Sequence, residues 1–167
     1  LTPRNLTNLA VQSSVVGIMA TGMVLVIGAR HIDLAVGSAL GFAGMLAAVV
    51  QTQSLPAEPS AVMLVASGIG AALLSGVAIG LWQGYWVAHR AVPAFVVTLA
   101  GLLVFRGAAY LLTNGRTVAP LEPAFEMLGG GIDGSIGATW SWALAVLGVA
   151  GLAYSTLRRR SERRRHN

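Results

Sequence analysis

Long uncharged stretches separated by short polar segments dominate the pattern of the chain. Charged side chains are absent from five such stretches, at residues 5–29, 34–57, 59–89, 91–105 and 134–157. A helix that crosses the apolar core of a bilayer needs about 20 predominantly apolar residues, and most of the stretches are that long. The pattern therefore predicts an all-α fold, a polytopic bundle of transmembrane helices.

We expect five membrane segments inside a membrane region that covers residues 1–157. The segments are expected near residues 6–29, 34–50, 61–83, 94–113 and 140–157. A polar turn around Arg30 separates the first two segments, and Asp33 suits the N-cap of the second. This turn is either a tight cytoplasmic loop or a break within the membrane. An Arg-rich tail, residues 158–167, follows the last segment.

The arginines predict the orientation of the chain in the membrane. With five spans, Arg30, Arg90 and the tail share one side of the membrane, and Arg4 and Arg116 share the other. Cytoplasmic loops carry the excess of Lys and Arg. The C-terminus is therefore expected in the cytoplasm, and the connector at residues 114–139 on the opposite side.

The composition excludes several classes of function. The chain is 55% hydrophobic and 10% charged, whereas soluble domains carry about 25% charged residues. It has no Lys, which a Walker-type ATPase needs, and no Cys for thiolate metal sites or thiol chemistry. The net charge of +5 comes largely from the tail, so no nucleic-acid surface is expected. No catalytic motif indicates an enzyme, and no cofactor is expected.

Glycines recur at four-residue spacing in two predicted helices. Gly37 and Gly41 lie in the second segment, and Gly76, Gly80 and Gly84 lie in the third. This spacing stacks glycine on one helix face and leaves a groove for a second helix. Packing within the bundle is the favoured interpretation, and an interface with another subunit is the alternative.

Arg106 is the one charge inside the fourth segment. A charged side chain at membrane depth costs at least about 2.5–3.5 kcal/mol on insertion scales. The structural interpretation pairs Arg106 with a carbonyl or carboxylate near the outer interface, and the functional one places it on a polar pathway. Residues 98, 102 and 106 share a helix face at four-residue spacing, so Thr98 and Arg106 are predicted to line one polar stripe.

Three polar groups have both a structural and a functional interpretation. His31 and Asp33 have no third ligand nearby, so no metal site is expected. For Asp33 the favoured interpretation is a helix cap, and the alternative is a place beside a translocation route. Trp82, Tyr85 and Trp86 are typical of an interfacial belt, and the alternative is stacking on a sugar ring. The Arg tail is interpreted as a topogenic anchor, with binding of anionic membrane lipid as the alternative.

The order of several short motifs resembles a known family. Residues 32–38, Ile-Asp-Leu-Ala-Val-Gly-Ser, are similar to the Ile-Asp-Leu-Ser-Val-Gly-Ser signature of permease subunits of bacterial ABC-type monosaccharide importers. The Ala-Arg-His that precedes this stretch looks most like the xylose branch of the xylose and ribose permeases. Further matches follow in order along nearly the whole chain, at residues 5–8, 92–99, 105–107 and 113–115.

This resemblance implies a multi-pass permease subunit of the bacterial inner membrane that forms the pathway for a monosaccharide, with xylose or a related pentose expected. It also implies a second permease subunit in a homodimer, a periplasmic sugar-binding protein, and cytoplasmic ABC ATPase subunits that hydrolyse the ATP. We expect Asp33, Ser38, Phe95, Thr98 and Arg106 to lie near the translocation pathway.

Two departures from the family pattern leave an alternative open. Ala35 stands where the family usually has Ser. Family members continue into a cytoplasmic coupling segment and a second set of helices, so the chain is expected to correspond to the N-terminal half. A truncated, non-transporting membrane scaffold is therefore the alternative function. A self-contained multidrug exporter is disfavoured, because none of the six acidic residues lies in the middle of a segment to couple protons.

Overall fold

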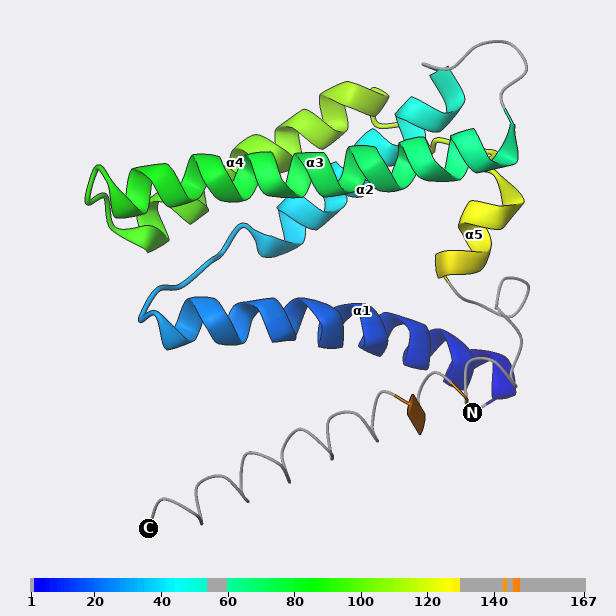
Figure 1. The fold of residues 1–167 in the computed structure, drawn as a ribbon, viewed down its shortest axis with the longest axis horizontal. Helices are drawn as coiled ribbons and strands as arrows, with labels where there is room; N and C mark the ends of the chain where they lie inside the picture. Colours follow the sequence, from blue (N-terminus) through cyan, green and yellow to red (C-terminus); the bar gives the residue numbers. More distant parts are fainter. Residues whose placement is uncertain (1, 54–59, 130–142, 144–145, 148–167) are drawn as a thin grey trace. The chain divides into compact units, whose positions relative to one another are not determined.

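The structure is a computed structural model that describes residues 2–53, 60–129, 143, 146 and 147 (Figure 1). Its helices are α1 (Pro3–Gly28), α2 (Val36–Gln53), α3 (Ala61–Ala88), α4 (Ala94–Thr113) and α5 (Pro123–Gly129). No strand occurs among these described residues. α1 to α4 are long and apolar enough to cross a membrane. The predicted all-α, polytopic fold is thereby confirmed.

The expected fifth segment, residues 140–157, falls outside the described residues apart from 143, 146 and 147. The tail at residues 158–167 also lies outside them. The chain divides into two compact units after Glu126. The helix packing and the cavities that follow belong to the first unit.

Local sequence explains where α3 and α4 begin and end. The Ser60 side chain accepts a hydrogen bond from the Met63 N–H at 3.3 Å and so caps the start of α3. α4 begins directly after Pro93 and ends at Thr113, and its C-cap residue Asn114 has a φ of 50°. Gly115 follows with φ at 67°, and these two left-handed residues turn the chain out of the helix.

Asp33 shapes the turn ahead of α2 and is not its N-cap, so this sequence interpretation is wrong. Its Oδ1 accepts a hydrogen bond from the Ala35 N–H at 2.7 Å, which closes a turn two residues long. The helix therefore begins at Val36 and not at Leu34. The Ala35 carbonyl takes part in the first helical turn and accepts the Ser38 hydroxyl at 2.9 Å.

α2 is the central helix of the described bundle, because it packs against both α3 and α4 (Figure 1). Its buried side chains include Ala43, Ala47, Ala48 and Val49. Small side chains let helices approach closely, which is how transmembrane helices associate when lipid is as apolar as their side chains. The described residues of α1, in contrast, include no buried side chain.

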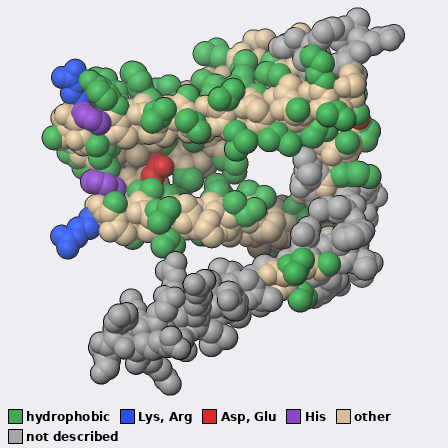
Figure 2. Space-filling model, in the orientation of Figure 1, with side chains coloured by type: hydrophobic (Ala, Val, Ile, Leu, Met, Phe, Trp, Pro, Cys, Tyr) green, Lys and Arg blue, Asp and Glu red, His purple; other side chains and the backbone are tan. Residues whose placement is uncertain are grey.

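Large apolar side chains cover the outside of the helices. Ile18, Leu25, Val62, Leu74 and Leu111 are between 73% and 78% exposed. Figure 2 shows hydrophobic side chains along the length of the helices, with the visible Arg and His side chains at their ends. A water-soluble monomer rarely exposes apolar patches of this extent, so these helix faces suit a hydrocarbon environment.

Candidate functional site

A side-chain hydrogen bond joins the turn between α1 and α2 to α4. Arg30 has a left-handed φ of 63°, and its N–H donates to the Ile27 carbonyl at 2.9 Å, so the chain leaves α1 sharply. The Thr98 Oγ1 of α4 lies 3.2 Å from the Ile32 carbonyl oxygen. This contact joins residues 66 positions apart in the sequence. The turn is therefore held against the bundle and does not extend freely from it.

Thr98 makes this contact from a buried position, where it is 5% exposed. Its hydroxyl also lies 2.9 Å from the Ala94 carbonyl and 3.4 Å from the Phe95 carbonyl of its own helix. A hydroxyl has one proton to donate, so α4 and the turn compete for it. The Thr98 hydroxyl consequently faces backbone carbonyls.

The other sequence-predicted pathway residues lie in different surroundings. Asp33 and Ser38 are half-buried and bonded to the backbone of the turn and of α2. Phe95 is 55% exposed. Arg106 is exposed and makes no hydrogen bond or ion pair with the part of the chain that the structure describes. Thr98 and Ser38 thus each bond to a carbonyl of the turn that contains Asp33, whereas Arg106 does not contact this turn by a hydrogen bond.

The predicted helix-packing glycines leave room for a side chain within the described chain. A Cβ atom added at any one of these five positions would meet no atom within 4 Å. They are Gly37, Gly41, Gly76, Gly80 and Gly84. The close approaches between described helices occur instead at Gly68 of α3 and Gly101 of α4. Close packing of another helix against these five glycines is therefore not observed within residues 2–53 and 60–129. Their role as a subunit interface stays a prediction.

Two buried glutamines were missed by the sequence reasoning. Gln51 of α2 is 7% exposed and Gln83 of α3 is 9% exposed. The Gln51 amide contacts Gly68, and the Gln83 amide contacts Gly101, so each glutamine reaches across to the next helix over a glycine. Both polar atoms of the Gln51 amide and the Nε2 of Gln83 are buried without a hydrogen-bond partner among the described residues. Buried polar groups are nearly always paired, so these atoms require an explanation.

Gln83 was missed because its helix is longer than the apolar pattern indicates. The third segment was expected to end at residue 83, which makes a glutamine there an ordinary boundary residue. α3 continues to Ala88, so Gln83 lies more than one helical turn inside the helix. The sequence signal that could have identified Gln83 was its position as a lone amide side chain between Trp82 and Trp86.

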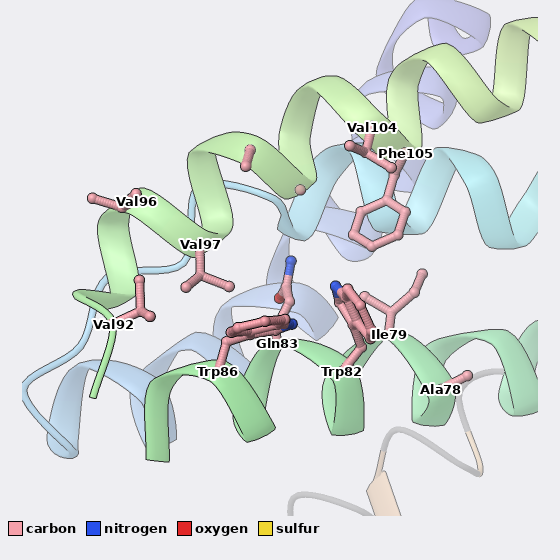
Figure 3. Close-up of a pocket in the computed structure, with 12 residues that line it drawn as sticks. Ala78, Ile79, Trp82, Gln83, Trp86, Val92, Val96, Val97, Val104 and Phe105 are labelled. Carbon is pink, nitrogen blue, oxygen red and sulfur yellow. The ribbon is translucent and has the colours of Figure 1, made fainter. Parts of the chain in front are cut away.

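A cavity of about 590 Å³ lies between α3 and α4 beside Gln83 (Figure 3). Trp82 and Trp86 flank the Gln83 side chain, which points toward α4. The two indole rings have centroids 5.7 Å apart at an interplanar angle of 73°. The remaining walls are apolar and include Val97 and Phe105 of α4. The cavity therefore combines one amide with two indoles in an otherwise apolar space.

Another, more polar hollow of about 300 Å³ lies at the far end of α4. Its lining includes Thr52, Gln53, Asn114, Arg116 and Thr117. The described helices thus carry hollows near both ends of α4.

The end of α3 holds a packed group of aromatic and basic side chains. The Tyr85 and His89 rings stack with centroids 5.5 Å apart, and the Arg90 Nε donates to the Tyr85 hydroxyl at 3.0 Å. These contacts fix the turn into α4. Within the described ranges, no group of three or more His, Cys, Asp or Glu side chains is placed to hold a metal ion.

Comparison with known proteins identifies the family. The family model described as "Branched-chain amino acid transport system / permease component" matches residues 5–158. The chain belongs to this permease family. Membership of this family and the four long apolar helices together indicate a multi-pass membrane protein.

Curated relatives of the permease chain carry sugar names. It is 40% identical over 148 residues to the xylose transport system permease protein XylH of Haemophilus influenzae, which covers 89% of this chain and 38% of the relative. It is 36% identical over 131 residues to the L-arabinose ABC transporter permease protein AraH of Azospirillum brasilense, covering 78% of this chain and 36% of the relative. It is 44% identical over 117 residues to the ribose import permease protein RbsC of Escherichia coli, covering 70% of this chain and 34% of the relative.

The permease chain thus spans a little over a third of the length of these relatives, between 34% and 38%. No solved structure matches it. The predicted resemblance to the xylose and ribose permeases is confirmed at the level of the family.

Proposed function

We propose that this permease chain forms part of the route by which an ATP-driven importer passes a pentose across the bacterial inner membrane. The observation that carries the proposal is that relatives named for xylose, L-arabinose and ribose align with 70% to 89% of the chain. These sugars are uncharged and have five carbon atoms each. Since α2 and α3 contain no charged side chain, the central helices suit a neutral solute.

We place the sugar route beside the turn between α1 and α2. Irregular backbone at membrane depth is tolerated only where it is buried in protein or lines a water-filled cavity. Helix ends at such a break present unpaired backbone groups to a solute. We therefore place Asp33, Ser38 and Thr98 beside the route, with Phe95 one turn before Thr98. We also place Arg106 beside the route, farther along α4, where it has no hydrogen-bond or ion-pair partner in the described chain.

The partners follow from the proposed import function. We infer cytoplasmic ABC ATPase subunits, because this chain has no Lys for a nucleotide-binding loop. We infer a periplasmic sugar-binding protein that delivers the sugar, and a second permease subunit. The open glycine faces on α2 and α3 offer that second subunit a surface for close helix packing. The arginine distribution favours a cytoplasmic C-terminus.

The proposal is tested by assembling the permease with its ATPase and sugar-binding subunits in lipid vesicles. Copurification of the three components and stimulation of ATP hydrolysis by D-xylose, L-arabinose or D-ribose are expected. A complex that assembles but whose ATP hydrolysis does not respond to any pentose would contradict transport and support the membrane-scaffold alternative.

A further inference from the structure

The cavity between α3 and α4 contains a polar group that the described fold leaves unpaired. Gln83 is more than nine-tenths buried, and its Nε2 has no hydrogen-bond partner among the described residues. The amide projects toward α4, beside Trp82 and Trp86 (Figure 3). An unpaired buried amide is unfavourable for the fold. The Nε2 packs over Gly101, so this amide must turn toward the cavity that Gln83 lines for a ligand there to supply the missing partner.

The groups around this amide match the chemistry of a sugar ring. The two indoles, which meet edge to face, offer large apolar surfaces on which the C–H face of a sugar can pack. The Gln83 amide offers both a donor and an acceptor for hydroxyl groups. The cavity volume of about 590 Å³ lies within the range of about 300–1,000 Å³ that is usual for small-molecule sites.

We propose that Trp82, Gln83 and Trp86 form a subsite that holds one neutral sugar ring in this cavity. The proposal rests on the proposed function of pentose passage and assigns to it residues that the sequence-predicted pathway did not include. A lipid acyl chain would fill the apolar space but leave the amide unpaired. A single amide between apolar walls binds weakly, which suits a route that must also release its solute.

Protection of an introduced cysteine tests the proposal directly. Ala78→Cys places a thiol on the cavity wall, and Val77→Cys places one on the same helix at a position that does not line the cavity. Both variants are prepared in the importer assembled in vesicles and labelled with a small neutral maleimide. D-xylose is expected to slow labelling of the cysteine at 78 and to leave labelling at 77 unchanged, with glycerol as the solute control.

Gln83→Met separates sugar binding from folding, because methionine has a similar length and shape but no amide. The D-xylose concentration that half-protects the cysteine at 78 is expected to rise about tenfold, as for the loss of one hydrogen bond. Gln51→Met is the matched control, since Gln51 is also buried over a glycine but does not line this cavity. It is expected to leave protection unchanged.

The possible outcomes distinguish failure of the subsite from failure of the proposed function. If the importer responds to pentoses but D-xylose protects the cysteine at 78 equally with and without the Gln83→Met substitution, the subsite is refuted and pentose transport stands. Labelling of that cysteine only by a lipid-soluble maleimide would refute the subsite by showing that lipid fills the cavity. If no pentose stimulates ATP hydrolysis, the proposed function itself fails.

Discussion

The Thr98 hydroxyl of α4 lies 3.2 Å from the carbonyl oxygen of Ile32, in the turn that separates α1 from α2. The sequence predicts that this polar turn is either a loop or a membrane break. In the structure it is attached to α4, a helix that begins about 60 residues later, at Ala94. Because turn and helix meet at a buried side chain, movement of one is expected to affect the other.

Thr98→Val tests this attachment, since valine has nearly the same shape without the hydroxyl. The free energy of unfolding in detergent is expected to fall by about 1 kcal/mol, because the Ile32 carbonyl loses its side-chain donor. Thr113→Val is the control: Thr113 is also buried, but among the described residues its hydroxyl donates to Ala109 of its own helix, at 3.2 Å. An equal loss in both variants would show that the contact between the turn and α4 contributes nothing.

Gln51→Met is expected to stabilise the bundle. Both polar atoms of the Gln51 amide are buried and unpaired among the described residues, and removing such a group recovers roughly 1–3 kcal/mol. Gln53→Met, at an exposed position of the same helix, is expected to change stability little. The measurement is the midpoint of thermal unfolding in detergent. A lower midpoint for Gln51→Met alone would reveal a partner for Gln51 that the described residues do not contain.

Gly101→Ala is expected to destabilise the contact of α4 with α3 and with the turn before α2. A Cβ at residue 101 would contact the Gln83 amide and would lie 3.2 Å from Phe105 and 3.3 Å from the Ala35 Cβ. The Gln83 amide can move aside, but Ala35 is fixed to the backbone, and overpacking of this kind costs about 1–3 kcal/mol.

Gly80→Ala is the matched control for Gly101→Ala, because a Cβ at residue 80 meets nothing within 4 Å. Alanine also favours helix over glycine, so Gly80→Ala is expected to be neutral or stabilising in the isolated permease chain. Thermal unfolding of both variants is the measurement. Destabilisation by Gly80→Ala in the assembled importer alone would place this glycine face at a subunit interface.

Arg106→Leu is expected to make the insertion of α4 into a membrane more favourable by roughly 1–3 kcal/mol. Arg106 lies nearer the Thr113 end than the Ala94 end of α4, so the gain is expected to be smaller than for an arginine at the centre of the helix. Arg116→Leu, beyond the end of α4, is expected to leave insertion unchanged. A glycosylation assay of α4 insertion measures both. Unchanged insertion of Arg106→Leu would show that the Arg106 head group reaches the interface without cost.

The helices could be predicted from the sequence because each depends on local signals. Residues 94–113 form α4 as Pro93 and the Asn114-Gly115 pair indicate, and the apolar runs account for the other three long helices. The start of α2 was predicted two residues too early, with Asp33 as its N-cap. A carboxylate that precedes a helix can bond either to the helix or to the turn before it, and only the backbone conformation decides.

The candidate site was less predictable because it depends on contacts between helices. Gly80 and Gly101 look alike in the sequence, and only the register of α3 against α4 shows that Gly101 receives the Gln83 amide while Gly80 stays open. Gln83 itself could be recognised only once α3 was seen to continue to Ala88. Helix register is set by side chains far apart in the sequence, which periodicity along one helix does not reveal.

Uptake of radiolabelled D-xylose into vesicles that contain the assembled importer tests the central claim most directly. The account predicts ATP-dependent accumulation of the neutral pentose that unlabelled L-arabinose and D-ribose inhibit, and that charged D-glucuronate leaves unchanged. Vesicles in which the assembled subunits hydrolyse ATP but accumulate no pentose above the level of protein-free vesicles would contradict it.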